Sequence, residues 1–130
     1  MNLGVGMSHK ERWEVTDEMT ALSVRSGGER VLSTPFLLAL MECSAFELAE
    51  AGMDRGMTTV GIKVSLNHIS PTPIGLVVWA EARITRIRDN TIDFEITAYD
   101  KDGVIGEASH TRAVVNSKKF KSIAAKKLDG

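Results

Sequence analysis

The sequence has few of the residues that build disulfide-bonded or metal-bound frameworks. Its 130 residues include a single cysteine, Cys43, so no disulfide can close within the chain. Cys43 lies inside an apolar segment, where a small core residue is expected. The three histidines are scattered, and neither Cys-x-x-Cys nor His-x-x-x-His occurs. We therefore predict no metal site.

An excess of one charge and long apolar runs are also missing. The net charge of −1 gives no electrostatic case for binding nucleic acid or an anionic membrane. No uncharged apolar stretch reaches the roughly 18–20 residues of a membrane-spanning helix. The first residues also lack the apolar run typical of a signal peptide, so we expect a cytoplasmic protein. A content of 43% hydrophobic and 25% charged residues is ordinary for a globular chain, and the length predicts one domain over residues 1–130.

The most apolar segment, residues 34–52, predicts a long helix with both ends marked. Thr34 is expected to cap the first turn, Pro35 to occupy the first helical position, and Gly52 to adopt the left-handed conformation just past the end. Almost every side chain in between is apolar, on all sides of the helix, which predicts a buried helix. Glu42 is the exception, and burying a carboxylate is costly unless a partner compensates for it.

Five segments have the composition or alternation of β-strands. They are residues 9–15, 57–70, 76–88, 91–100 and 104–116. The connections after the third and fourth of these segments are short, so an antiparallel meander of the last four strands is predicted. The second segment places five side chains on the face expected to point into the core: Val60, Ile62, Val64, Leu66 and His68.

An antiparallel sheet that wraps one central helix buries the apolar surface of both, so the predicted fold class is α+β. A helix that is apolar on all sides needs more cover than its own sheet provides, which favours a homodimer or a larger assembly. Residues 117–130 hold five lysines and one acid. We interpret this tail as a solvated helix or a frayed end, with a phosphate-attracting patch as the alternative.

Three polar residues stand where a helix begins or where apolar residues are expected: Thr34, Glu42 and His68. Each has an ordinary structural explanation as a cap, a solvent-reaching carboxylate or a core histidine. Together they hold the parts of an acyl-transfer site, because a carboxylate and an imidazole can activate a hydroxyl or a water. Free amides at the helix start could bind an oxyanion. Thr34 and Glu42 lie roughly 12 Å apart along the helix, so a substrate must span them or one must come from a partner subunit.

These features resemble the hotdog-fold thioesterases, and most closely the fluoroacetyl-CoA thioesterase family, over nearly the whole chain. The matching stretches are TPFLLALMECSAFELA, VGIKVSLNHISPTPIG and GEASHTRAVVNSKKF. The resemblance implies a hotdog fold, an acyl-CoA hydrolase that needs no cofactor because CoA is part of its substrate, and active sites at a dimer interface. By position it implies that Thr34, Glu42 and His68 are catalytic. It also implies that Gly61 and Arg112 contact the substrate. The alternatives are that Gly61 only forms a strand bulge and that Arg112 is an ordinary surface arginine.

Two departures from the family concern the substrate and the helix start. Fluoroacetyl-specific members carry a phenylalanine-rich lid before the helix, whereas residues 23–32 are short and contain no aromatic side chain. Another short or medium acyl group is therefore expected. Pro35 stands where the family has glycine, and it removes one amide from the helix start. An oxyanion contact must then use a later amide or the Thr34 hydroxyl.

The sequence therefore predicts a thioesterase that hydrolyses a short or medium acyl-CoA. Glu42 is the predicted base or nucleophile, His68 orients or protonates groups at the reacting centre, and Thr34 positions the thioester or relays a proton. Two alternatives keep the same fold: a non-catalytic module that binds acyl-CoA or another small ligand, and a dehydratase acting on an enoyl thioester. The dehydratase assigns no role to Thr34.

Overall fold

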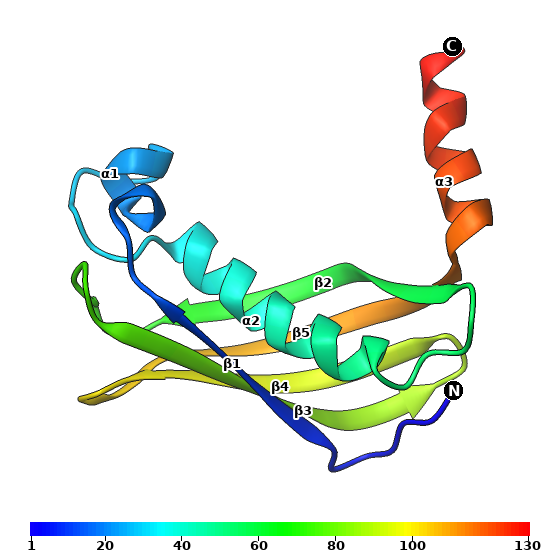
Figure 1. Cartoon of the computed structure of the whole chain (residues 1–130), viewed down its shortest axis with the longest axis horizontal. Helices are drawn as coiled ribbons and strands as arrows, with labels where there is room; N and C mark the ends of the chain where they lie inside the picture. The colour runs from blue at the N-terminus through cyan, green and yellow to red at the C-terminus, as the bar shows by residue number, and fades with distance from the viewer.

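The computed structural model describes all 130 residues, as one five-stranded antiparallel sheet curved around a long helix (Figure 1). The strands are β1 (Ser8–Glu14), β2 (Met57–His68), β3 (Val77–Arg88), β4 (Thr91–Asp100) and β5 (Gly103–Asn116). The helices are α1 (Ala21–Val24), α2 (Thr34–Glu50) and α3 (Ser117–Ala125), with short 3-10 turns η1 (Asp17–Met19) and η2 (Lys126–Leu128). The predicted α+β class and the five strands are confirmed.

The core lies between α2 and the inner face of the sheet. The alternation predicted for β3 and β4 is correct, because Val78, Ala80 and Ile84 are fully buried, as are Ile92 and Ala98. Small side chains such as Ala80 and Ala98 let the helix lie close to the middle of the sheet. The opposite side of α2 is only partly covered within one chain, since Leu38, Cys43 and Phe46 are half-buried.

Both ends of α2 differ from the prediction. The N-cap is Ser33, whose hydroxyl accepts a hydrogen bond from the Phe36 amide, so Thr34 and Pro35 are the first two helical residues. Because Thr34 is not the cap, its hydroxyl is free for another partner. Gly52 does not have a positive φ. Its missing side chain makes room for the N-terminal segment instead, since a Cβ there would lie 2.6 Å from the Asn2 carbonyl oxygen.

The position of β2 corrects the predicted meander. The strand order is β1-β3-β4-β5-β2, so β3, β4 and β5 form the meander while β2 pairs only with β5, at the free edge of the sheet. The link after β2 contains two prolines and crosses the end of the sheet to reach β3. On the way, Thr72 is buried and donates a hydrogen bond to Asp100 at the end of the central strand β4. The crossing leaves one side of β2 without a strand partner.

A bulge in β2 also corrects the predicted face of that strand. The pairing with β5 shifts between Gly61 and Lys63, so Ile62 is the extra residue. Before the bulge, Thr59 and Gly61 pair with residues of β5 on the helix side, and Thr59 is buried. Ile62 is 57% exposed, although the simple alternation placed it in the core. The bulge thus turns Gly61 toward α2.

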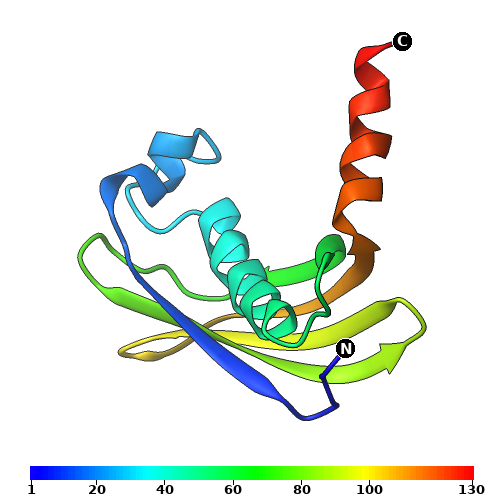
Figure 2. The same ribbon diagram turned by 45° about the vertical axis from the view of Figure 1, so that its right-hand side comes forward.

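The chain ends in α3, which rises from the end of β5 on the same side of the sheet as α2 (Figures 1 and 2). All of its residues are exposed except Ser117, which is half-buried. The side chain of the N-cap residue Asn116 accepts a hydrogen bond from the Lys119 amide. The solvated-helix interpretation of the tail is correct for this chain alone. No helix in the structure is both long enough and apolar enough to span a membrane.

Candidate active site

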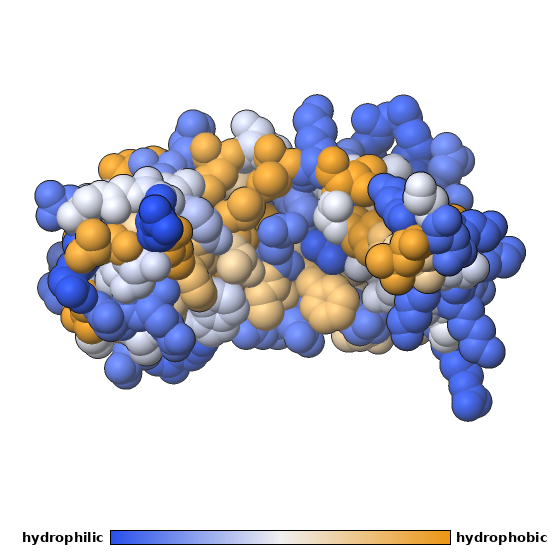
Figure 3. Space-filling view, turned by 90° about the horizontal axis from the view of Figure 1, so that it is seen from above, coloured by the Kyte–Doolittle hydropathy of each residue, from blue (hydrophilic) through white to orange (hydrophobic).

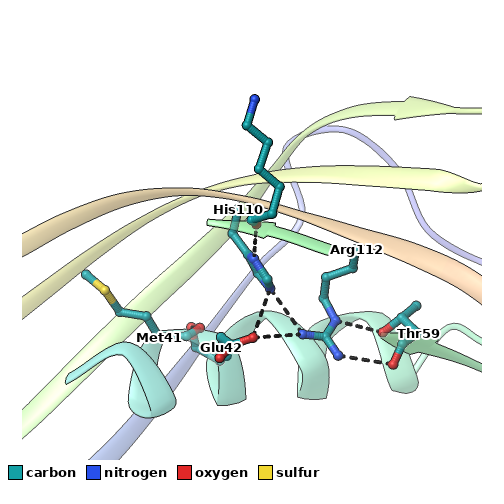
Figure 4. Close-up of polar contacts among 7 residues, drawn as sticks. Met41, Glu42, Thr59, His110 and Arg112 are labelled. Atoms are coloured by element: carbon teal, nitrogen blue, oxygen red, sulfur yellow. Dashed lines mark hydrogen bonds and ion pairs between the residues drawn. The ribbon is translucent and has the colours of Figure 1, made fainter. Parts of the chain in front are cut away.

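The carboxylate of Glu42 lies between α2 and the first half of β2, beside two basic side chains of β5 (Figure 4). Its Oε2 atom is 3.9 Å from Nε2 of His110 and 4.0 Å from Nη1 of Arg112. Both distances exceed hydrogen-bond length, and 39% of the Glu42 side chain is exposed. The carboxylate is therefore near a positive charge, and its oxygens remain free to accept protons or bind a reacting group.

The two basic residues belong to one hydrogen-bonded network next to that carboxylate. Arg112 donates from Nε to the Thr59 hydroxyl at 2.9 Å and from Nη2 to the Thr59 carbonyl at 3.1 Å. Nδ1 of His110 lies 2.8 Å from the Lys63 carbonyl, which only accepts, so that nitrogen carries a proton. The remaining nitrogen, Nε2, is then the acceptor for Arg112 Nη1 at 3.1 Å. Burial lowers the pKa of His110, and the neighbouring guanidinium acts in the same direction, which favours the neutral imidazole.

Gly61 makes room for the carboxylate and its two basic neighbours. A Cβ atom on Gly61 would lie 2.8 Å from Glu42 Oε2, 3.1 Å from His110 Cε1 and 3.4 Å from Arg112 Nη1. Gly61 does not have a positive φ, so the backbone itself does not require glycine here. The missing side chain therefore lets Glu42 Oε2, His110 and Arg112 lie close to the backbone of β2. The structure thus brings together three predicted site residues: Glu42, Gly61 and Arg112.

The other two predicted residues form a separate pair. Thr34 Oγ1 lies 2.8 Å from His68 Nδ1, and Nε2 of His68 is buried without a partner. Burial lowers the pKa of His68, which favours a neutral ring able to accept the hydroxyl proton. His68 also borders a cavity of about 220 Å³ with Val31 and residues 69–71.

The two groups are far apart within one chain. Thr34 and Glu42 are separated by about 12 Å along α2, and His68 and Gly61 by roughly 24 Å along β2. Within one chain His68 is therefore not a neighbour of Glu42, because His110 and Arg112 lie beside the carboxylate instead. Sequence reasoning missed His110. Its two-residue spacing from Arg112, on the buried face of the last strand, was the available signal.

The helix start offers fewer backbone donors than predicted. The Phe36 amide is already bound to the Ser33 hydroxyl, and Pro35 has no N–H. The Leu37 amide bonds to the Ser33 carbonyl. The exposed Thr34 hydroxyl is thus the polar group at this helix end that is best placed to contact a ligand.

The chain as a whole is similar to known proteins. The family model described as FlK, fluoroacetyl-CoA-specific thioesterase, matches residues 15–118. The fluoroacetyl-CoA thioesterase of Streptantibioticus cattleyicolor is 28% identical over 90 residues, which cover 69% of this chain and 65% of that protein. The match therefore spans just under two thirds of the length of this curated relative.

The solved structures agree in fold. A structure of the fluoroacetyl-CoA thioesterase FlK superimposes with a TM-score of 0.92 at 22% identity, covering 98% of both chains. A thioesterase superfamily member from Thermus thermophilus gives 0.92 at 20% identity, covering 99% of this chain and 96% of the other. A hot-dog-like protein from Thermanaerovibrio acidaminovorans gives 0.89 at 21% identity, covering 97% and 93%. The predicted hotdog fold is confirmed.

Proposed function

Because the chain belongs to the FlK family of fluoroacetyl-CoA-specific thioesterases, we propose that it hydrolyses the thioester of a short or medium acyl-CoA to the free acid and CoA. The observation that supports this most directly is the Glu42 carboxylate. It lies beside a buried arginine, it accepts no hydrogen bond within the chain, and it is partly exposed next to the backbone of Gly61. A thioester carbonyl placed against the exposed side of this carboxylate would lie within reach of its oxygens.

Glu42 begins the reaction in one of two ways. As a base it removes a proton from water, which then attacks the thioester carbonyl. As a nucleophile it attacks the carbonyl itself, and water later hydrolyses the resulting anhydride. In both routes the C–S bond breaks and the CoA thiolate takes up a proton. The network of Arg112 and His110 holds the carboxylate in position and supplies a nearby positive charge.

The Thr34–His68 pair acts on the other side of the reacting carbonyl. The Thr34 hydroxyl donates a hydrogen bond to the thioester oxygen or relays a proton, and His68 accepts or returns that proton. The reaction needs no cofactor or metal in this scheme. The Thr34 hydroxyl contacts the oxyanion, because Pro35 has no N–H and the Phe36 amide is already bound to Ser33.

A homodimer brings the two groups together. If two β2 strands pair antiparallel about Ser65, Lys63 faces the partner's Asn67. Because the bulge takes up Ile62, Gly61 then faces the partner's His68. Glu42 of one subunit and the Thr34–His68 pair of the other thereby line one site. The free edge of β2 and the exposed Ile62 and Val64 along it support this pairing.

The segment before α2 affects which acyl group the site can accept. Residues 25–30 are all exposed and contain no aromatic side chain, so the chain itself places no bulky gate over Thr34. We therefore propose an acyl group other than fluoroacetyl as the preferred substrate. The cytoplasmic location stays a prediction, as does assembly into a dimer of dimers.

The test is thiol release from a panel of acyl-CoA esters of increasing chain length, with fluoroacetyl-CoA and an enoyl-CoA included. We expect hydrolysis by the wild type and loss of kcat in Glu42→Gln, while Glu47→Gln, an exposed glutamate of the same helix, retains full rate. Ligand-dependent thermal stabilisation without thiol release would support the binding module instead. Hydration of the enoyl-CoA without thiol release would support the dehydratase.

A further inference from the structure

Helix α3 carries an apolar stripe that nothing in its own chain covers. Phe120, Ile123 and Ala124 lie on one face of the helix, at the three- and four-residue spacing of a helix surface. Phe120 is 42% exposed, Ile123 63%, and Leu128 beyond them 89%. Seen from above, hydrophobic atoms gather beside this projecting end of the molecule and again over the centre (Figure 3). The lysines Lys118, Lys119 and Lys121 occupy the other sides of the helix.

A second uncovered surface, of mixed polarity, lies at the opposite end of β2. The cavity of about 220 Å³ is lined by Val31 and by residues 68–71, and Ile69 on its rim is 56% exposed. One wall of this cavity is His68, whose Nε2 has no partner. The cavity therefore adjoins the Thr34–His68 pair, and nothing within the chain closes it.

The stripe cannot close the cavity of its own chain. Ser117, the first residue of α3, donates to the Gly56 carbonyl just before β2 begins, whereas the cavity follows the last residue of β2. The length of β2 between them, from Met57 to His68, is roughly 37 Å. A helix of nine residues is only about 14 Å long.

We propose that α3 packs on the partner subunit, where Phe120 and Ile123 cover the partner's cavity beside the Thr34–His68 pair. This inference rests on the dimer of the proposed function. Pairing of β2 about Ser65 places the partner's Ile69 opposite Val60 and the partner's Pro71 opposite Thr58. The cavity of one subunit then lies within a few residues of the base of the other subunit's α3.

The distance across the sheet between α3 and the partner's β2 is also short enough for this contact. β5 lies two strand spacings, roughly 10 Å, from the partner's β2, and a helix with its side chains is about 10–12 Å wide. The contact between Ser117 and Gly56 starts α3 over β2, on the side of the free edge. The helix axis then rises on the side of the sheet that holds α2 and the site (Figure 1). The second subunit is thus the occupant that continues the proposed interface.

This contact has a role in catalysis. The segment before α2 has no aromatic side chain, so Phe120 of the partner supplies the aromatic cover for the Thr34–His68 side of the site. Such cover excludes water from the hydrogen bond between the hydroxyl and the imidazole and encloses the acyl-thioester. Each active site would then draw on α3 of the opposite chain.

Cross-linking tests the contact directly. In a Cys43→Ala background, a variant with both Phe120→Cys and Ile69→Cys is treated with a short bismaleimide. We expect covalent dimers from the double variant, few from either single variant, and few when Val5→Cys replaces Ile69→Cys. Val5 is 66% exposed and precedes the other edge strand, β1. Dimer mass by light scattering without cross-linking of positions 69 and 120 would refute the α3 contact and leave the dimer standing. A monomer would refute both.

Kinetics provides the second readout. Phe120→Ala should keep the dimer mass and lower kcat/KM about tenfold, as expected when an aromatic anchor of an interface is removed. Phe120→Leu should restore most of the loss, and Leu128→Ala, nearer the end of the chain, should have little effect. An unchanged kcat/KM in Phe120→Ala would contradict the inference. Absence of thiol release from the wild type would instead contradict the proposed function.

Discussion

The most discriminating perturbation is the addition of one methyl group at Gly61. Ordinary contact with a Cβ begins at 3.4 Å, whereas the new Cβ would lie 2.8 Å from Glu42 Oε2, so the carboxylate must withdraw by at least 0.6 Å. It can do so, because it is the end of a flexible and partly exposed side chain. His110 Cε1, at 3.1 Å, must also shift slightly. The backbone conformation accepts alanine, and the lower entropy of the unfolded chain offsets part of the strain.

Gly61→Ala should therefore fold with nearly unchanged stability and lose activity. Moving a catalytic group by a fraction of an ångström to 1 Å can cost about a hundredfold in rate, so we expect kcat/KM to fall by roughly that factor. Thiol release from acyl-CoA measures the rate, and thermal unfolding measures the stability. Gly28→Ala is the matched control, because a Cβ there meets nothing within 4 Å. Full activity in Gly61→Ala would refute the placement of the reacting carbonyl beside Glu42.

Three further predictions concern the same site. Thr34→Val should lower kcat strongly and Thr34→Ser should retain most of it, both with little change in stability, whereas Ser33→Ala should cost about 1 kcal/mol of stability because Ser33 is the N-cap. Rate assays and chemical denaturation distinguish the role of Thr34 from that of Ser33, and equal destabilisation by substitutions at both residues would contradict the assignment of Ser33 as the cap. Burial lowers the pKa of His68, so the neutral ring persists as the pH falls through the ordinary histidine value of about 6.5, and the acidic decline of kcat/KM should begin below that value; a decline centred above 6.5 would show that His68 is not the titrating base. Arg112→Gln should reduce the free energy of unfolding by about 2–4 kcal/mol, because it removes a buried cation and leaves the hydrogen-bonded neighbours of Arg112 unpaired. If a denaturant titration shows a loss below 1 kcal/mol, the hydrogen-bonded network of Arg112 is not required for stability.

The sequence alone determined the elements and most of their buried faces. Alternation at period two is a local property, so the strands β3 and β4 and their core residues followed directly from it. The apolar content of residues 34–52 likewise indicated the buried helix, and the charge of Glu42 within it indicated the candidate site. Gly61 and Arg112 were identified only through the resemblance to a family, because neither residue stands out in the local sequence pattern.

Only the tertiary structure decided which of these residues meet. Pairing of β2 with β5 places His110 and Arg112 under Glu42, across about 70 residues of sequence, and no local pattern encodes that contact. The bulge at Ile62 reverses the facing of the first half of β2, because one extra residue moves every side chain before it to the other face. Capping by Ser33 rather than Thr34 depends on a shift of one residue at the helix start, and that shift leaves the threonine hydroxyl available to His68. The chemical groups of the candidate site can therefore be identified from the sequence. Which of them are neighbours is determined by strand order and register, which depend on contacts between distant parts of the chain.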